Sequence, residues 1–584
     1  MKPVQTQICA VFNAAIKRTL EGVAAVAPEA NIVAANPKFG DYQCNNAMQL
    51  FKTSGQALNC KNPKDMADKI VGELGEDREL FENIIVAPQG FITVKLNQKW
   101  IQEAVDRVLT EGFEYTDPNP KRVVVDFSSP NIAKEMHVGH LRSTIIGEST
   151  CRILEAVGHK VTRLNHVGDW GTQFGMLIEY MKETYPDFLT TLPEISDLQN
   201  FYKASKKRFD DDAEFKRKSQ LQVVALQSGD KFARQAWQSI CDISRKAFQQ
   251  LYDRLDITLE ERGESFYNDM IAPIVSELEK DGLVVDSQGA KCIFTSVDEV
   301  PLMVVKSDGG FGYDSTDMAA IHHRLITMQQ DWLVYITDLG QENHFFKIFD
   351  AAKQAGWHTP PTTRVDHVGF GVVQGEDGKK FKTRSGETVK LSALLDEAEE
   401  RALIELKSRL NTEGGSHTSL NEEEIEAAAK VIGTSAVKYF DLRQNRVTNY
   451  IFSYDKMLDP KGNTAVYLLY AYARICSITR KAGVSPKDLL VSHGKINITH
   501  EKERALALEI LRFPDIIASI LNDLFAHRLP EYMWDLSNRF SAFYTECKVV
   551  GSEEQTSRLL LCEATRMALE KCFFLLGIVP LERM

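Results

Sequence analysis

The chain has 584 residues and exceeds the length at which a single hydrophobic core stops growing, so we expect three or four domains. Its 43% hydrophobic and 26% charged residues are ordinary for a soluble globular protein, no apolar run approaches the ~20 residues of a membrane span, and its ten cysteines form no C-x-x-C pair, which disfavours disulfides and a zinc knuckle. The net charge of −12 disfavours non-specific nucleic-acid binding, but it leaves a specific partner open because a basic surface can lie on an acidic protein.

The N-terminal region, residues 1–117, is predicted to form an α+β domain of its own. Its first residues lack the pattern of a secretion signal or a transit peptide, so we expect a cytoplasmic protein. Apolar residues recur at helical spacing over about 8–26 and 63–74, and Gly90–Leu96 has the composition of a strand. The turn-rich T-D-P-N-P-K-R at 116–122 marks the boundary with the next domain.

A strand, a helix and a second strand follow this boundary. The β-branched run Val123–Phe127 predicts a buried parallel strand, helical spacing continues to Gly158, and a second strand is expected at Lys160–Asn165. Such βαβ units bind ligands beyond the carboxyl ends of their strands. The pattern therefore predicts an α/β nucleotide-binding domain, to which we assign residues 118–388.

The helix of this unit opens with His-x-Gly-His. His137 and His140 share one face of its first turn, where unpaired N–H groups and the helix dipole favour a polyphosphate to which two imidazoles can donate. Gly139 lacks a Cβ and lets an adenine or a ribose approach the backbone. The alternatives are a zinc half-site, for which this segment offers no obvious third ligand, and a surface pair without function.

The rest of the chain divides into an insertion, more strands and a long helical part. Residues 180 to about 260 are helical and charge-rich, which indicates a helical insertion. Segments at Lys291–Asp308 and Trp332–Thr337 are expected to complete the nucleotide-binding sheet. The remainder is predicted to be almost wholly helical, as a linker region at 389–460 and a terminal bundle at 461–584.

A basic loop with glycines at both sides, G-E-D-G-K-K-F-K-T-R-S-G, precedes the helical part. Its basic and hydroxyl side chains include Lys379, Lys380, Lys382, Thr383 and Arg384. Such a loop can close over a phosphate, and its cations would stabilise a pyrophosphate leaving group. A solvated hairpin is the alternative, and the histidine pair earlier in the chain favours phosphate binding.

Acceptor side chains gather near the expected carboxyl ends of the strands. They are Asp126, Asn131, Tyr313, Asp317 and Gln341. Carboxylates and amides placed together would suit a cationic ligand with many N–H donors, of which a guanidinium is one example. Each of these residues could instead be a cap or turn residue.

Several motifs resemble those of the arginyl-tRNA synthetases, over nearly the whole chain. H-V-G-H at His137–His140 resembles the class I "HIGH" signature and follows S-S-P-N-I-A-K, while N-H-V-G-D-W-G-T-Q-F-G at Asn165–Gly175 is the most specific match. F-G-D-Y-Q at Phe39–Gln43, G-N-T-A-V-Y-L-L-Y-A-Y-A-R-I at Gly462–Ile475 and the terminal L-G-I-V-P-L-E-R-M also match. The resemblance implies a Rossmann-like catalytic domain, an added N-terminal domain and an all-α anticodon-binding bundle.

This resemblance also implies an arginine–tRNA ligase reaction. Arginine and Mg-ATP would give arginyl-adenylate and pyrophosphate, and the terminal ribose of tRNA(Arg) would then take the arginine. The loop at Lys380–Arg384 departs from the family's Lys-Met-Ser-Lys-Ser because it lacks the second lysine, and Lys134, just upstream of the histidines, is expected to replace it. The family implies a monomer, and we expect no bound zinc, no organic cofactor and no membrane association.

The resemblance assigns the remaining site residues. The arginine site would comprise Asp126, Ser129, Pro130, Asn131, His140, Tyr313, Asp317 and Gln341. Contacts with tRNA would come from Phe91 in the N-terminal domain and from Ser453, Gly462, Asn463, Tyr467 and Tyr544. Aromatic faces can stack on splayed anticodon bases, although core packing explains most of the aromatic residues in the terminal bundle as well.

Two other functions fit parts of the sequence. A small-molecule adenylyltransferase with the same histidine motif would share the βαβ unit but would not explain the long helical part. An RNA-binding protein derived from a synthetase would not require His137, Asp317 and Gln341 together. An aminoacylation assay with each amino acid separates all three possibilities.

Overall fold

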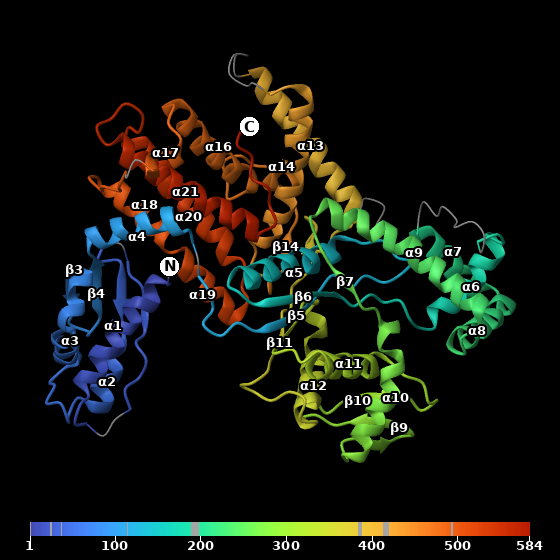
Figure 1. The fold of residues 1–584 in the computed structure, drawn as a ribbon. Helices are drawn as coiled ribbons and strands as arrows, with labels where there is room; N and C mark the ends of the chain where they lie inside the picture. The colour runs from blue at the N-terminus through green and yellow to red at the C-terminus, as the bar shows by residue number, and fades with distance from the viewer. Residues whose placement is uncertain are drawn as a thin grey trace.

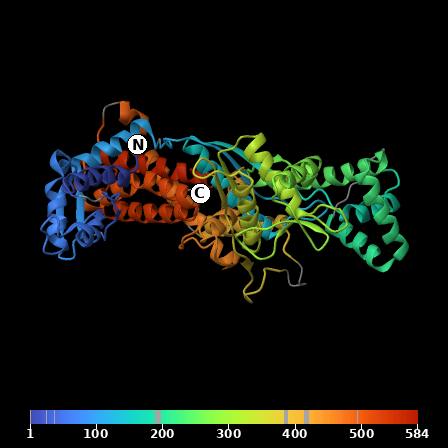
Figure 2. The ribbon, with the colours of Figure 1, turned by 90° about the horizontal axis from the view of Figure 1, so that it is seen from below.

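The computed structural model describes residues 2–23, 26–36, 38–113, 115–188, 198–382, 388–412, 420–491 and 494–584. The molecule is elongated, and both ribbon views show the same arrangement of its parts (Figures 1 and 2). The N-terminal domain lies at one end beside the C-terminal helices, a parallel sheet lies in the middle, and a helical insertion lies at the other end.

A five-stranded parallel sheet, in the order β12-β11-β5-β6-β7, forms the centre. Its strands are β5 (Arg122–Asp126), β6 (Lys160–Asn165), β7 (Glu260–Glu261), β11 (Trp332–Tyr335) and β12 (Arg364–His367). Val123, Val124 and Val125 are 0% exposed, as expected for a parallel strand covered on both faces. The helix α5 (Val138–Ala156) connects β5 to β6, so the predicted βαβ unit is confirmed.

The segment Lys291–Asp308 does not complete this sheet, so that prediction is wrong. It forms β9 (Ala290–Ile293) and β10 (Leu302–Val305), which make a separate antiparallel sheet with β8 (Val285–Ser287). Leu302 and Val304 are buried whereas Met303 is 43% exposed, and this alternation is typical of a sheet with only one covered face. The covered face packs against α11 (Tyr313–His322), which follows α10 (Glu264–Lys280). The prediction for Trp332–Thr337 is confirmed by β11.

The insertion is helical, as predicted. Its helices are α6 (Gln173–Thr184), α7 (Leu198–Asp211), α8 (Ala213–Gln227) and α9 (Lys231–Arg254). The last of them returns to the central sheet, where Oγ of Ser244 accepts a hydrogen bond from the backbone N–H of Ala133 at 3.0 Å. α9 therefore supports the loop after β5 as well as the insertion.

The N-terminal domain has an antiparallel sheet in the order β1-β2-β4-β3. Its elements are α1 (Val4–Thr19), β1 (Ile32–Ala34), β2 (Tyr42–Cys44), α2 (Asn46–Ser54), α3 (Pro63–Gly72), η1 (Gly75–Leu80), β3 (Phe81–Val86) and β4 (Ile92–Leu96). The next helix, α4 (Gln98–Glu111), packs against α18 and α21 of the C-terminal part. The helix that follows the N-terminal sheet thus connects this domain to the terminal bundle.

The F-G-D-Y-Q motif lies at this junction. Nη1 and Nη2 of Arg504 donate to the carboxylate of Asp41 at 3.0 and 2.8 Å. The hydroxyl of Tyr42 donates to Asp515 at 2.9 Å, and the backbone N–H of Gln5 donates to the same carboxylate at 3.0 Å. We refer to Asp41, Tyr42, Arg504 and Asp515 as the interdomain clasp. The motif therefore connects the N-terminal domain to the C-terminal helices.

The C-terminal part is almost wholly helical, as predicted. It comprises α13 (Leu391–Thr412), α14 (Glu422–Leu442), α15 (Tyr454–Met457), α16 (Ala465–Ala482), α17 (Pro486–Val491), α18 (Glu501–Leu511), α19 (Phe513–Asp523), α20 (Arg528–Glu546) and α21 (Gln555–Leu575). A short exception is β14 (Tyr450–Ile451), which pairs in parallel with β13 (Val373–Gln374).

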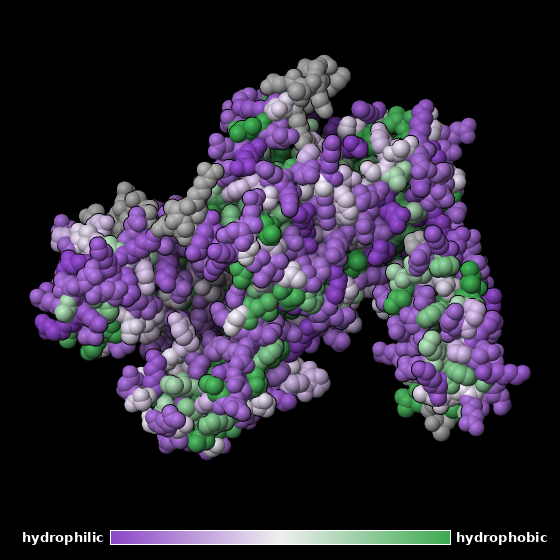
Figure 3. All heavy atoms as spheres, turned by 180° about the vertical axis from the view of Figure 1, so that it is seen from behind, coloured by the Kyte–Doolittle hydropathy of each residue, from purple (hydrophilic) through white to green (hydrophobic). Residues whose placement is uncertain are grey.

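The surface seen from behind is mainly hydrophilic, with apolar residues scattered over it (Figure 3). In the part of the chain that the structure describes, no helix is both long enough and apolar enough to cross a membrane.

Candidate active site

The loop between β5 and α5 is held in a strained conformation. Ser128, Ser129 and Ala133 have φ angles of 72°, 47° and 62°, in the left-handed region that residues with a Cβ rarely adopt. Side chains of neighbouring elements fix it: the backbone N–H groups of Ser128 and Ser129 donate to Oγ of Ser143 and Oδ1 of Asn165, both at 2.9 Å. Such strain is found mostly at functional sites.

The loop after β6 continues this construction. The backbone N–H of Gly168 donates to the carbonyl of Pro130, and the N–H of Ile132 donates to the carbonyl of Gly168, both at 3.1 Å. A Cβ at Gly168 would lie 2.3 Å from Oδ1 of Asn131, so a larger residue here would displace the Asn131 side chain. The H-V-G-D-W-G motif therefore places Pro130 and Asn131 at the sheet edge.

The two signature histidines form a capping pair at the start of α5. Nδ1 of His137 accepts a hydrogen bond from the backbone N–H of Gly139, and Nδ1 of His140 accepts from the backbone N–H of His137, both at 3.1 Å. The ring centroids are 4.1 Å apart. Because each Nδ1 is an acceptor, each neutral ring carries its proton on Nε2 and keeps that N–H for another partner.

Both histidines are neutral at physiological pH. Burial lowers the pKa of His137, and the charges of Lys380 and Lys134 lower it further. Burial, together with His137 and the same two lysines, lowers the pKa of His140 to about 3. The structure thus brings Lys134 and Lys380, predicted from separate segments, to the same pair of imidazoles.

The basic loop is tied to the histidine segment at its far end. Lys390 pairs with His137 in a β-bridge, and the backbone N–H of Leu391 donates to the carbonyl of Met136 at 2.9 Å. Nζ of Lys390 lies 2.7 Å from a carboxylate oxygen of Glu135. Of the loop residues predicted from sequence, Thr383 and Arg384 lie outside the described residues, whereas Lys380 and Lys382 are described and exposed.

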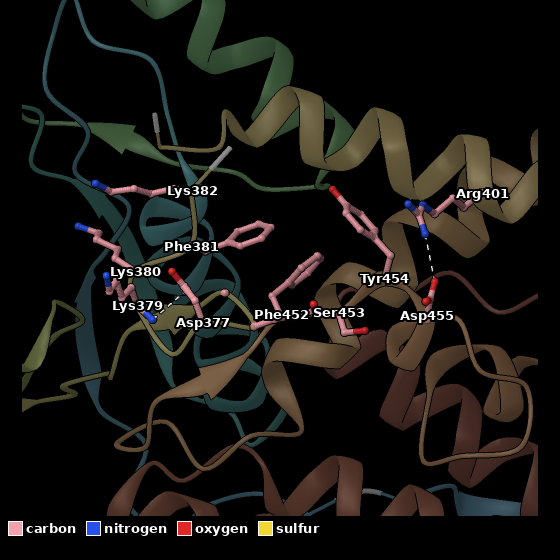
Figure 4. Close-up of a pocket in the computed structure, with 12 residues that line it drawn as sticks. Asp377, Lys379, Lys380, Phe381, Lys382, Arg401, Phe452, Ser453, Tyr454 and Asp455 are labelled. Carbon is pink, nitrogen blue, oxygen red and sulfur yellow. Dashed lines mark hydrogen bonds and ion pairs between the residues drawn. The ribbon is translucent and has the colours of Figure 1, made fainter. Parts of the chain in front are cut away.

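A pocket of about 730 Å³ lies beside this loop (Figure 4). Its lining residues are Gly375, Glu376, Asp377, Lys379, Lys380, Phe381, Lys382, Arg401, Phe452, Ser453, Tyr454 and Asp455. The ring of Phe381 points toward Phe452, 5.0 Å away between centroids, while the chains of Lys380 and Lys382 extend in the opposite direction. Ser453, predicted to contact tRNA, therefore lies beside the basic loop.

A second group of side chains surrounds Asp317 on α11. Nε2 of His344 lies 2.6 Å from Oδ2 of Asp317, and Nδ1 of His344 lies 3.3 Å from Oδ1 of Asp314. Burial alone would lower the pKa of His344, but hydrogen bonds to the two carboxylates outweigh it and raise the pKa to about 9. His344 is therefore an imidazolium that fixes Asp317. It lies in the first turn of α12 (Glu342–Gln354), and the predicted Gln341 comes directly before this helix.

Glu264 is a site residue that the sequence reasoning missed. Burial and the charges of Asp169 and Asp317 raise its pKa to about 8. Burial also raises the pKa of Tyr313, with Glu264 and Asp317 as the nearest charges, although the residue is 73% exposed. Tyr313, Asp317 and Glu264 thus share one site. A glutamate at the start of a helix is so common that its sequence carried no signal.

Asp126 is bound by a residue of the chain itself. Nη2 of Arg324 lies 2.7 Å from Oδ2 of Asp126, and the hydroxyl of Ser129 donates to Oδ1 at 3.2 Å. Arg324 is 0% exposed and lies in η2 (His323–Thr327), a π-helical turn, which is a feature found often at functional sites. Both carboxylate oxygens of Asp126 therefore already have a partner within the chain, Oδ2 in an ion pair and Oδ1 in a hydrogen bond.

Apart from Ser453, the predicted tRNA contacts lie in the N-terminal domain and in the C-terminal helical part. Phe91, half-buried, precedes β4; Tyr467, also half-buried, lies with its ring centroid 4.9 Å from Trp534; and Tyr544 is 40% exposed. Gly462 and Asn463 lie in the turn before α16, where Oδ1 of Asn463 accepts from the hydroxyl of Tyr439 at 2.5 Å. Core packing explains other aromatic residues of the bundle, because Tyr472, Phe540 and Phe543 are at most 1% exposed.

Within the described ranges, no three His, Cys, Asp or Glu side chains are grouped so that they could hold a metal ion. The absence of zinc stays a prediction.

Comparisons with known proteins give matches along the whole chain. The family model "Arginyl tRNA synthetase N terminal domain" matches residues 7–96, "tRNA synthetases class I (R), catalytic domain" matches 104–454, and "DALR anticodon binding domain" matches 468–584. The chain is 50% identical to a chloroplastic/mitochondrial arginine–tRNA ligase of Arabidopsis thaliana, over 99% of this chain and 90% of the relative. It is 48% identical to a cytoplasmic arginine–tRNA ligase of Xenopus tropicalis, over 100% and 89%. The crystal structure of arginyl-tRNA synthetase from Plasmodium falciparum superposes with a TM-score of 0.87 and 39% identity, with all of both chains covered.

Proposed function

The chain belongs to the arginyl-tRNA synthetase family, and from that premise we propose which of its residues carry the reaction. It is an ATP-dependent arginine–tRNA ligase, which activates arginine as arginyl-adenylate and charges tRNA(Arg). The class I catalytic domain, the N-terminal domain and the helical C-terminal domain agree with that activity. The individual roles below are our proposals.

The state of the signature histidines is the observation that carries the proposal for the first step. His137 and His140 are neutral, and each keeps an Nε2–H that its own helix does not use. When the arginine carboxylate attacks the α-phosphorus of ATP, negative charge grows on the phosphoryl oxygens, and the two N–H groups stabilise it. A Cβ at Gly139 would lie 2.9 Å from the ring of His137, so glycine lets that imidazole keep its position as the helix cap.

Two lysines from separate loops supply the positive charge for the phosphates. Lys134 and Lys380 lie close enough to both imidazoles to lower their pKa values, so their ammonium groups reach the same region. As pyrophosphate leaves, Lys134 acts from the loop after β5 and Lys380 from the basic loop. Lys382, Thr383 and Arg384 are proposed to complete the closure of the basic loop over the phosphates.

The arginine side chain is proposed to bind in the acidic group around Asp317. The imidazolium of His344 holds that carboxylate, and Glu264 lies within its electrostatic reach. A guanidinium presents planar N–H donors, which several carboxylate and amide oxygens can accept together. A lysine has fewer donors and would leave some of these acceptors unpaired. Tyr313 and Gln341 are proposed to line the same pocket for the arginine side chain. Asp126, Ser129, Pro130, Asn131 and His140 are proposed to receive the α-amino and carboxylate end.

We further propose four domains with separate contacts to tRNA. Residues 1–117 would meet the tRNA elbow through Phe91, 118–388 would perform catalysis, 389–460 would meet the stem, and 461–584 would read the anticodon. The proposed stem and bundle contacts are Ser453, Gly462, Asn463, Tyr467 and Tyr544. The matched anticodon-binding model supports the last assignment.

Metal use, assembly state and location remain proposals as well. We propose that Mg²⁺ enters with ATP as part of the substrate. We propose a monomer, as the family resemblance implies. A cytoplasmic location is supported by the Xenopus tropicalis relative, while the Arabidopsis thaliana relative is chloroplastic/mitochondrial.

The test is an aminoacylation assay with total tRNA and each amino acid in turn. We expect charging with arginine alone. His137→Ala should retain arginine binding while the adenylation rate falls by about 10²–10³-fold, as for other lost transition-state donors. His140→Ala should show a similar fall in rate together with weaker arginine binding, because His140 is also proposed to contact the amino acid. Charging with a different amino acid would refute the assigned pocket. Wild-type adenylation by both variants would refute the role of the histidines.

A further inference from the structure

Arg142 is a buried cation on the catalytic helix that the proposed reaction does not use. It lies on α5 two residues after His140, and it is 1% exposed. Its Nε lies 3.0 Å from Oδ2 of Asp441, near the end of α14, which is also 1% exposed. The pair thus joins the helix that begins at the histidines to the helical part of the chain.

The same guanidinium holds two further segments of backbone. Nη1 of Arg142 donates to the carbonyl of Gly371 at 2.7 Å and to the carbonyl of Thr448 at 3.3 Å. Gly371 lies just before β13 and Thr448 just before β14, the two strands of the parallel pair. The strands approach so closely here that a Cβ at Gly371 would lie 2.7 Å from the carbonyl of Thr448.

Aromatic rings and a hydroxyl enclose this ion pair. The hydroxyl of Tyr450 donates to Oδ2 of Asp441 at 2.7 Å, and the guanidinium carbon of Arg142 lies 5.1 Å from the Tyr450 ring centroid and 5.7 Å from that of Phe370. Arginine satisfies all of these contacts at once because its planar group donates in several fixed directions. A lysine could reach only some of them.

The two strands lead directly to functional segments. β13 runs into the basic loop, where Gln374 forms a β-bridge with Lys380 and the backbone N–H of Phe381 donates to the carbonyl of Val373 at 3.0 Å. β14 runs into Ser453, which lines the pocket beside that loop. Arg142 is therefore the contact through which α5 fixes the root of the basic loop.

A buried ion pair is weak evidence for added stability, because the cost of removing both charges from water offsets most of their attraction. The value of this pair lies in its geometry. We propose that Arg142, held by Asp441, is a positioning residue for adenylation, which sets the basic loop that carries Lys380 at the distance from His137 and His140 that the reacting phosphate requires. This inference rests on the proposed roles of those three residues.

The test separates adenylation from the other steps. In Arg142→Lys we expect the kcat of arginine-dependent ATP–pyrophosphate exchange, measured with tRNA present, to fall by about 10–100-fold, since a displacement of about 1 Å has effects of that size. The KM for arginine should stay within about twofold of wild type. The rate of transfer from preformed arginyl-adenylate to tRNA should not change. Asp441→Asn and Tyr450→Phe should show the same split, to a smaller extent for Tyr450→Phe.

A matched control lies farther along the same helix. Arg152 also pairs with carboxylates, at 2.7 Å from Glu148 and 2.8 Å from Asp256, and it donates to a backbone carbonyl, that of Phe574. Arg152→Lys should lower the melting temperature without lowering the kcat of exchange. If Arg142→Lys does not fold, Tyr450→Phe, which keeps both charges, carries the test.

The outcomes distinguish this inference from the proposed function. Wild-type kcat in the Arg142 and Tyr450 variants, a parallel rise in KM for arginine, or an equal loss in Arg152→Lys would overturn the positioning role. Failure of the proposed function would appear instead as wild-type exchange by His137→Ala and Lys380→Ala.

Discussion

The guanidinium of Arg324 lies 2.7 Å from the carboxylate of Asp126, so a cation of the protein itself occupies an acceptor that the sequence suggested for the substrate. Burial and nearby acidic groups act in opposite directions on Arg324, and the net effect raises its pKa well above the usual value, so it stays charged. Tyr267 and Tyr335 enclose it with ring centroids 5.8 and 5.1 Å away. The proposed arginine site therefore contains a fixed guanidinium, paired with a carboxylate that is proposed to receive the α-amino and carboxylate end of the substrate.

Asp126→Asn is expected to cost about 3 kcal/mol of unfolding free energy, because it leaves the buried Arg324 without its counter-charge. Denaturant unfolding measures this loss. The double variant Asp126→Asn with Arg324→Met should recover most of the stability, since no buried charge remains, but it should not recover the wild-type KM for arginine. Equal stability of wild type and Asp126→Asn would show that the pair contributes no net interaction.

Arginine binding is expected to tighten as the pH rises from 7 to 9. Glu264, with a pKa raised to about 8, is mostly protonated at pH 7, and a bound guanidinium favours its anionic form. Binding at neutral pH therefore releases a proton, and the KM for arginine should fall as Glu264 ionises. Glu264→Gln, measured over the same pH range, corrects for titration of the amino acid itself. A variant with the same pH profile as wild type would exclude Glu264 as the source.

The imidazolium of His344 is expected to make the folded state less stable as the pH rises. Its folded-state pKa of about 9 exceeds the ordinary value, so its contribution is fully present below about pH 6.5 and is lost as the pH rises through 9. We expect this contribution to be on the order of 2 kcal/mol. Unfolding of wild type and His344→Gln at pH 6 and pH 10 should differ at the lower pH and converge at the higher one.

Local patterns in the sequence predicted the parts of the site that neighbouring residues determine. The strand, the histidine-capped helix and the second strand follow from apolar periodicity and turn residues within one short segment. The pairing of Asp126 with Arg324 and the role of Glu264 could not be predicted in this way, because their partners lie far apart in the chain and meet only when the sheet is assembled. The strand pattern near Lys291 was ambiguous for a related reason, since periodicity shows that a strand exists but not which sheet it joins.

Lys134→Ala is expected to lower the kcat of arginine-dependent ATP–pyrophosphate exchange by about 10²-fold, with little change in the KM for arginine. The lysine lies near both histidines, and its ammonium is 4.9 Å from the ring centroid of Tyr202. Lys216, on α8, makes a similar contact with Phe209 at 5.4 Å and lies on the insertion, so Lys216→Ala is the matched control and should exchange at the wild-type rate. Unchanged turnover in Lys134→Ala would refute its assignment as the replacement lysine.

The interdomain clasp is expected to affect tRNA binding without affecting the chemistry. The carboxylate of Asp41 and the guanidinium of Arg504 form two hydrogen bonds with side chains only 10% and 15% exposed. Arg504→Met would remove the counter-charge of this carboxylate and leave it with the hydrogen bond from the backbone N–H of Leu96 at 2.7 Å. We expect the loss of about 2–3 kcal/mol to appear as faster proteolysis between the N-terminal domain and the bundle.

The same variant should raise the KM for tRNA, because the N-terminal domain and the bundle are proposed to contact different regions of one rigid ligand, and a looser joint makes their simultaneous binding less favourable. The KM for arginine should not change, since the clasp lies at the opposite end of the molecule from the insertion and outside the arginine site. Arg566→Met is the control: Arg566 pairs with Glu563 at 2.8 Å within α21 of the bundle, so its loss should reduce stability without the selective effect on tRNA. A wild-type KM for tRNA in Arg504→Met, despite faster proteolysis, would show that the N-terminal domain does not contribute to tRNA binding through this joint.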